Sequence, residues 1–176
     1  MKKLMFGMML CVMMALVLLP VSAAFSGIGT GDPSNPYETT TAAQLDEVRD
    51  DLTTHYKLIS DIDLSKWNNP SHGTDPSYIN GESWEPIGDY SDPFNGTFDG
   101  AGHITTGLFI DRTRSTTDDI GLFGGIGSSG TVKNLGVVGG SVTGTGTSTG
   151  TIYVHVGGVV GWNDGEITDC YNTGKR

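Results

Sequence analysis

Positive charge is scarce in this chain of 176 residues, which holds 10 Lys and Arg against 20 Asp and Glu for a formal net charge of −10. Nucleic-acid binding depends on Lys and Arg contacts to phosphates, so this balance argues against a nucleic-acid partner. The same balance disfavours attachment to anionic membrane surfaces. Glycine, in contrast, is abundant, with 27 residues.

Long apolar runs are absent except at the N-terminus. Met1-Lys2-Lys3 is a basic start, residues 4–19 are apolar, and Val21-Ser22-Ala23-Ala24 offers a cleavage site of small residues. This order is typical of a secretory signal peptide, which we predict over residues 1–23 or 1–24. The alternative is a retained membrane anchor, but about 16 apolar residues are short for a span of about 20. We therefore expect a secreted or cell-surface protein with no membrane span after cleavage.

Cysteine is nearly absent. Of the two cysteines, Cys11 lies inside the predicted signal peptide, so Cys170 is alone in the exported chain and no internal disulfide can form. A free cysteine is commonly a small core residue, and we expect this role for Cys170. A surface thiol and an intermolecular bridge are the alternatives.

Helical patterns are also rare. Thr41 and Gln44 have the spacing of a capping box, and Leu45, Val48 and Leu52 follow at helical intervals. The sequence therefore predicts one short helix that begins at Thr41.

The other segments predict strands and loops. Residues 55–64 alternate apolar and polar side chains in the manner of strands, and one short strand is expected around Tyr37. Prolines, asparagines and glycines mark residues 65–83 as a long loop. We divide the mature chain into a lead-in over residues 24–64, this loop, and a β-rich repeat region over residues 84–176.

The repeat region contains segments that align with one another. Gly102–Asp111, Gly130–Gly139 and Gly165–Gly174 each place a short strand between two turns, and Gly121–Gly124 recurs as Gly158–Gly161. Such units cannot bury their few apolar residues alone, but stacked units align them into one column. We predict an all-β solenoid of parallel coils; a glycine-rich β-sandwich is the structural alternative.

Nine segments of the chain follow one another in an order that is specific when taken together. They are GTGDPSNPY, TTTAAQL, HYKLISDIDLS, WEPIG, FNGTFDGAGH, GLFGG, NLGVVGGSV, VGGVVG and DCYN. Their order resembles the GLUG-motif repeats of secreted and surface β-helical proteins. The resemblance covers nearly all of residues 29–174 and implies a right-handed parallel β-helix, often adhesin-like and sometimes attached to catalytic modules. It carries no established chemistry for the repeat itself.

The sequence departs from the usual pattern of this family in its number of copies. It has one GLFG-type unit and one GGVVG unit, so we expect a short or incomplete β-helix that is capable of stacking on further repeats. An uncapped solenoid exposes unpaired backbone groups at its last coil, which natural proteins avoid by capping or by charge.

Catalytic and metal-binding patterns are few. The four histidines lack metal-ligand spacing, no serine lies in a Gly-x-Ser-x-Gly turn, and no phosphate-binding loop is present. Asp61, Asp63 and Asp99 are the strongest calcium candidates, but we expect Asp61 and Asp99 to cap turns. Asp118-Asp119 is expected in a turn. We predict no catalytic residue, no metal site and no cofactor.

One tract is of low complexity. Threonine alternates with mostly glycine from Thr143 to Thr151. Neighbouring coils lack matching threonines, so we expect a flexible or edge loop rather than a binding face.

We expect an exported, non-enzymatic protein that serves adhesion or acts as a scaffold, with glycans or cell-surface proteins as partners. Trp67, Tyr78 and Trp84 flank or lie within the long loop and are the candidate ligand contacts, because an aromatic ring can stack on a sugar. The competing expectation for Trp84 is packing on the first coil. The alternative functions are a secreted polysaccharide-active enzyme or its accessory module, and an N-terminal fragment of a larger surface protein.

Overall fold

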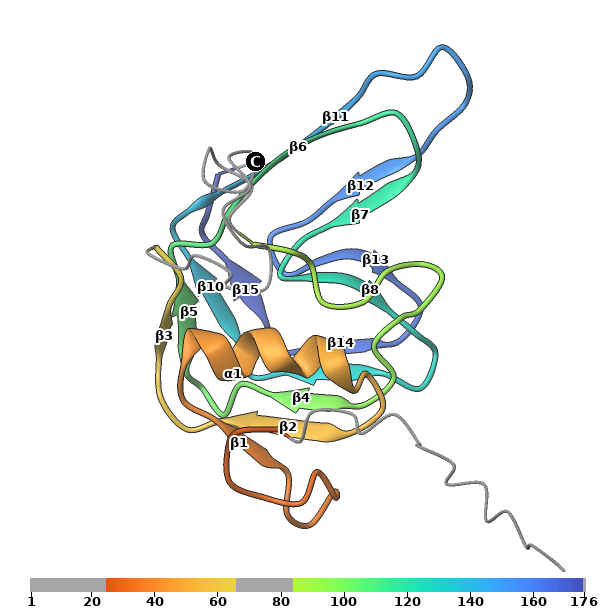
Figure 1. Ribbon diagram of the computed structural model, residues 1–176. Helices are drawn as coiled ribbons and strands as arrows, with labels where there is room; N and C mark the ends of the chain where they lie inside the picture. The colour runs from red at the N-terminus through yellow and green to blue at the C-terminus, as the bar shows by residue number, and fades with distance from the viewer. Residues whose placement is uncertain (1–24, 66–83, 176) are drawn as a thin grey trace, which may run out of the picture.

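The computed structural model describes residues 25–65 and 84–175 (Figure 1). The predicted signal peptide, and the predicted loop beyond Ser65, lie outside these residues. Within the described part, no helix is long and apolar enough to cross a membrane. The elements are β1 (Tyr37–Thr39), α1 (Ala42–Glu47), the 3-10 turn η1 (Val48–Asp50), β2 (His55–Leu58), β3 (Ile62–Asp63), β4 (Thr97–Asp99), β5 (Ile104–Thr106), β6 (Phe109–Arg114), β7 (Asp118–Ile120), β8 (Phe123–Ile126), β9 (Thr131–Lys133), β10 (Gly136–Val138), β11 (Ser141–Gly146), β12 (Val154–Val156), β13 (Val160–Asn163), β14 (Glu166–Thr168) and β15 (Tyr171–Asn172).

The strands stack in parallel. One sheet has the order β1-β2-β4-β9-β14, and a second has the order β15-β10-β5-β3. Three further pairs, β6 with β11, β7 with β12 and β8 with β13, are also parallel. Successive windings of the chain thus lie on one another. The expected β-rich fold with parallel strands is confirmed, and the β-sandwich alternative is wrong because sandwiches pair their strands antiparallel.

The core is a column of apolar side chains inside the windings. Tyr56, Phe98 and Val132 occupy equivalent register positions in consecutive strands of the first sheet, and all three are buried. Ile167 continues the column in the last winding but is 39% exposed. Figure 1 shows α1 lying across the near end of the windings, where its Leu45 is fully buried. The column is therefore covered at one end and exposed at the other.

The single predicted helix is confirmed, and its cap differs slightly from the expected box. Thr41 Oγ1 accepts the Gln44 backbone N–H at 3.2 Å, as expected. The Gln44 side chain instead accepts the backbone N–H of Thr40, at 2.8 Å. Leu45 and Val48 lie on one helical face and are fully buried, so packing of this face adds to the cap in stabilising so short a helix.

The register corrects one alignment of the repeats. Thr97 pairs with Thr131, which pairs with Glu166, so Gly96 is the counterpart of Gly130 and Gly165. The alignment that began at Gly102 is therefore wrong. The extra length of the turn between β4 and β5 shifts the sequence match, whereas the backbone pairing follows the strands.

The threonine tract is partly a strand. Residues 141–146 form β11, which pairs with β6 over its whole length. Figure 1 shows β6, β11, β7 and β12 extending as an arm beyond the other windings. The expected loop is thus wrong for residues 143–146, because neighbouring β6 supplies backbone partners that do not depend on side-chain pattern.

Cys170 is half-buried against the core, with its Sγ 3.3 Å from the carbonyl oxygen of Thr168. Burial raises the pKa of this thiol, although hydrogen bonding with Leu135 and Thr168 acts in the opposite direction. The expected core-facing role is consistent with this position.

Candidate functional site

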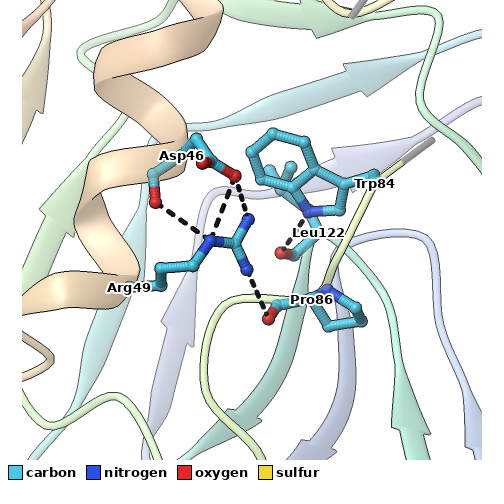
Figure 2. Close-up of polar contacts among 5 residues, drawn as sticks. All are labelled: Asp46, Arg49, Trp84, Pro86 and Leu122. Atoms are coloured by element: carbon cyan, nitrogen blue, oxygen red, sulfur yellow. Dashed lines mark hydrogen bonds and ion pairs between the residues drawn. The ribbon is translucent and has the colours of Figure 1, made fainter. Parts of the chain in front are cut away.

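The structure places Trp84 in the core. The ring is 1% exposed, and Nε1 donates a hydrogen bond to the Leu122 carbonyl oxygen at 3.1 Å (Figure 2). The Arg49 guanidinium lies over the ring, 5.2 Å from its centre. Because the ring is buried, it has no surface on which a sugar could stack, and Trp84 packs in the core as the competing expectation had it. Trp67 and Tyr78 lie outside the described residues.

Figure 2 shows why the segment after Trp84 is held firmly. Arg49 binds the Asp46 carboxylate in the helical region and also donates from Nη1 to the Pro86 carbonyl oxygen at 3.1 Å. All three guanidinium nitrogens of Arg49 are engaged in this way. The helical region thus fixes the backbone that leads into the next turn.

That turn presents an aromatic ring to solvent. The Asp89 carboxylate accepts the backbone N–H groups of Ser91 and Asp92, and the Asp89 N–H donates to the Asp92 carbonyl oxygen at 3.1 Å. Aspartate commonly closes turns in this manner. Tyr90 at the tip of the turn is 65% exposed.

Asp119 ties this turn to the strands. It is 3% exposed, and its Oδ2 accepts the Tyr90 backbone N–H at 2.9 Å. Strand register places His155 directly beside it, with 2.6 Å between His155 Nδ1 and Asp119 Oδ1. The expected turn at Asp118-Asp119 is wrong, since both residues belong to β7 and pair with β12.

The carboxylate of the neighbouring Asp118 contacts two arginine side chains of β6. Arg114 Nε donates to Asp118 Oδ2 at 3.0 Å, and Arg112 Nη1 lies 3.7 Å from the same oxygen. Arg112 is only 7% exposed, yet its Nε has no hydrogen-bond partner. The buried Nε of this guanidinium therefore lacks an acceptor, which costs stability.

Further rings surround Asp119. The Trp162 ring lies edge-on to Tyr90 with 5.0 Å between centroids, and Tyr153 stacks on His155 at 6.2 Å. Tyr153 is 61% exposed. We call these five residues, Tyr90, Asp119, Tyr153, His155 and Trp162, the Tyr90 cluster. Each of the last three comes from a later winding than Asp119, so the cluster exists only through stacking.

Two adjoining cavities lie beside the cluster, and both are lined by Asp89, Asp118 and Asp119. The larger has a volume of about 350 Å³ and the smaller about 190 Å³. We call them together the Tyr90 cavity. The larger part is lined by Arg49, Asp50, Leu52, Glu85, Pro86, Gly88, Asp89, Asp92, Arg112, Asp118 and Asp119, and the smaller by Asp89, Tyr90, Ser91, Thr117, Asp118 and Asp119.

The lining is strongly acidic but does not gather into a metal site. Six carboxylate residues face the larger part against two arginines. Among the residues that the structure describes, no three His, Cys, Asp or Glu side chains come together in a way that could hold a metal ion. Burial raises the pKa of Asp50, and the Asp46 carboxylate raises it further.

The former calcium candidates serve the backbone instead. Asp61 Oδ1 accepts the Ile104 N–H at 3.0 Å and lies 3.1 Å from His103 Nδ1, and these two contacts lower the pKa of Asp61. Asp99 Oδ1 accepts the Ala101 N–H at 2.8 Å. Asp99 therefore caps its own turn, as expected. The same expectation is wrong for Asp61, whose carboxylate bonds the backbone of the adjacent winding because the stacking of the windings brings Ile104 beside it.

One feature of the sequence indicates the contact between Asp119 and His155. Gly121–Gly124 and Gly158–Gly161 align at an interval of 37 residues, and extending this alignment backwards brings the neighbourhood of Asp119 beside that of His155. The contact of Trp162 with Tyr90 had no such sign, because these residues belong to windings that do not resemble each other in sequence.

Comparison with known proteins supports the family resemblance. Residues 152–175 match the family model described as "The GLUG motif". A "Putative Gly-rich membrane protein" of Evansella cellulosilytica is 43% identical over 124 residues, covering 69% of this chain and 13% of that protein. "Halomucin" of Haloquadratum walsbyi is 34% identical over 145 residues, covering 75% of this chain and 2% of that protein. The chain thus spans a small part of the length of these relatives.

One solved structure is similar. It is described as a "putative immunoglobulin A1 protease" from Bacteroides ovatus, with a TM-score of 0.50 and 22% identity, and the match covers 84% of this chain and 40% of that one. At this identity the likeness concerns the fold alone. The resemblance to GLUG-motif proteins is confirmed, and the chain carries a GLUG motif.

Proposed function

We propose that this GLUG-motif chain is an exported, non-enzymatic module that works at the cell surface or outside the cell, in adhesion or as a scaffold. The N-terminal sequence has the order of a secretory signal peptide. The names of its relatives point in the same direction, since one is called a membrane protein and the other halomucin.

We further propose that the windings form a right-handed parallel β-helix. The two sheets take their strands in the same winding order, and every strand pair named for the described residues is parallel. Connections between parallel strands of one sheet are right-handed in about 98% of cases. The last winding leaves the outer edges of β14 and β15 unpaired within the described residues, so further repeats are able to stack there.

The observation that carries a binding role is the Tyr90 cluster. Tyr90 is well exposed and lines the smaller part of the Tyr90 cavity, and the exposed ring of Tyr153 stacks on His155. The paired strands hold these residues in place before a partner binds. Less conformational entropy is therefore lost on binding. Glycans or cell-surface proteins are the proposed partners.

Export and binding are tested separately. The full chain, with a C-terminal tag, is expressed in a bacterial host, and the exported protein is analysed by N-terminal sequencing; we expect it to begin at residue 24 or 25. The labelled protein is then applied to glycan arrays and to intact cells. Retention in the cytoplasm would contradict the export proposal, and absence of binding to every glycan and cell type would contradict the binding role.

A secreted polysaccharide hydrolase is the second candidate, and one observation favours it. Hydrolysis of a glycosidic bond uses one protonated and one ionised carboxyl group on either side of the bond. Asp50, with its raised pKa, faces the same cavity as Asp118 and Asp119. Release of reducing ends from a polysaccharide by the wild-type chain, with loss of this activity in Asp50→Asn, would favour the enzyme over the binding module.

A further inference from the structure

We propose that the Tyr90 cavity binds a neutral sugar and discriminates against acidic sugars. This inference rests on the proposed binding role and names its ligand class. The larger part of the cavity, at about 350 Å³, falls in the range of about 300–1,000 Å³ that is usual for small-molecule sites.

The lining combines acceptors with donors. The carboxylates of Asp89 and Asp92 present acceptor oxygens, whereas the guanidinium of Arg112 presents only N–H donors. Arg112 lines the cavity although its side chain is more than nine-tenths buried, so it is held in place by its surroundings. A hydroxyl group both donates and accepts, so it matches carboxylates and a guanidinium at once. A ligand with several neighbouring hydroxyls is therefore the best chemical match.

The charge of the lining disfavours acidic ligands, and its geometry does not suit a metal ion. Asp118 is paired with Arg114 and Arg112, and Asp119 with His155 Nδ1, but the carboxylates of the lining still outnumber its arginines. A uronate or other acidic sugar would bring a further negative charge beside them, and like charges at close range are unfavourable. A metal ion requires several oxygens converging on one point. The described side chains do not provide such a group.

The rings at the rim favour a sugar over a simple polyol. Tyr90 lines the smaller part of the cavity, is 65% exposed, and is supported edge-on by Trp162 at 5.0 Å. Its backbone N–H is held by buried Asp119, so the turn that carries the ring is fixed. A pyranose has an apolar face of C–H groups and an equatorial rim of hydroxyls. The apolar face matches the exposed ring, while the hydroxyls match the charged lining.

The test is a titration of the exported protein with methyl hexopyranosides, with the corresponding hexuronates, and with Ca²⁺ alone, followed by tryptophan fluorescence and by ligand-observed NMR. Tyr90→Ala removes the exposed ring, and Arg112→Gln replaces a guanidinium of the lining with a neutral amide. Tyr171→Ala is the matched control, because Tyr171 is also an exposed tyrosine, at 52%, and does not line this cavity. Circular dichroism establishes that each variant is folded.

We expect at least one neutral pyranoside to bind at least tenfold more tightly than its uronate. Tyr90→Ala and Arg112→Gln should each weaken binding about tenfold, a loss equivalent to about 1.4 kcal/mol, and Tyr171→Ala should leave it unchanged. If Arg112→Gln does not fold, Tyr90→Ala alone decides, since its side chain is on the surface.

Three results would overturn the inference: tighter binding of uronates, a response to Ca²⁺ alone, or sugar binding that is insensitive to Tyr90→Ala. The last result would leave the proposed binding function intact and move its site elsewhere. Failure to bind these sugars, with retained binding to cells, would also overturn only the inference. Failure to bind any glycan or cell would contradict the proposed function as well.

Discussion

Replacing Phe98 by alanine removes a large, fully buried side chain from the apolar column. Phe98 is fully buried, and its ring packs edge-on against Phe123 with 5.3 Å between centroids. Truncation of a buried phenylalanine to alanine costs about 3–5 kcal/mol, so we expect a loss of about 4 kcal/mol in the free energy of unfolding. With a urea m-value of about 2 kcal/mol per M, the unfolding midpoint should fall by about 2 M.

The matched control is Ile167→Ala, at the equivalent register position of the last winding. Full burial of an isoleucine contributes about 1.5–3 kcal/mol. Ile167 is 39% exposed, so its truncation should cost only about 1 kcal/mol. Urea unfolding followed by circular dichroism measures both variants.

Equal losses for Phe98→Ala and Ile167→Ala would refute this reasoning. They would mean that the last winding is covered in solution, or that the windings do not form one continuous column. If Phe98→Ala does not fold, Phe98→Leu is compared with Ile167→Val, and the loss should again be larger at the fully buried Phe98 than at the partly exposed Ile167.

Four further predictions follow from individual residues. A Cβ at Gly161 would lie 2.5 Å from the backbone nitrogen of Ile120 in the neighbouring winding. Gly161→Ala should therefore lower stability by about 1–3 kcal/mol in thermal unfolding. Gly150→Ala is the control and should have little effect, because the nearest atom to its Cβ would be 3.6 Å away. Burial raises the pKa of Tyr56 to about 12. The same tyrosine ionises with a pKa of about 10 in the unfolded chain, so the free energy of unfolding should fall between about pH 10 and 12. Alkaline unfolding of Tyr56→Phe should lack this loss. Burial acts to raise the pKa of Asp99, but hydrogen bonds from Asn134 and the Ala101 N–H and the charge of Lys133 lower it overall. The stabilisation by Asp99 should therefore be present above about pH 4 and be lost as pH falls through the folded pKa. Acid unfolding of Asp99→Asn should lack this loss of stability. Burial raises the pKa of Cys170, so iodoacetamide should alkylate it more slowly at neutral pH in the folded chain than in urea, and equal rates would contradict its position.

The sequence predicted the elements whose stability is local. The helix after Thr41 was predictable because its cap and its apolar face lie within a few residues of one another. The strands at residues 55–58 and 62–63 alternate in burial as their side chains alternate in polarity. The correspondence of Gly130 with Gly165 was also correct, since both precede strands joined by equally long turns.

The sequence could not predict contacts that depend on exact stacking. The counterpart of these glycines in the earlier winding is Gly96 and not Gly102, a difference set by the length of one turn. Trp84 was a candidate ligand contact because it borders a polar loop. Its burial depends on a carbonyl group of Leu122 and on Arg49, both distant in sequence.

The candidate site illustrates the same limit. Asp118-Asp119 lies in a run of polar residues that resembles a turn. Its strand conformation comes from pairing with β12, and this pairing also brings His155 to Asp119. A hydrogen bond from the backbone N–H of Tyr90 to Asp119 fixes the turn that carries the exposed ring. No local sequence pattern predicts this contact, because the two residues are 29 positions apart.

The most direct test of a binding role for the Tyr90 cluster is NMR mapping of a neutral pyranoside on the ¹⁵N-labelled full-length protein. We expect the largest shifts at the backbone N–H of Tyr90, which bonds to Asp119, and at the indole N–H of Trp162. Residues of the last winding, from Glu166 to Asn172, should not shift. Shifts confined to that winding, or no shift at saturating sugar, would contradict the assignment of this site.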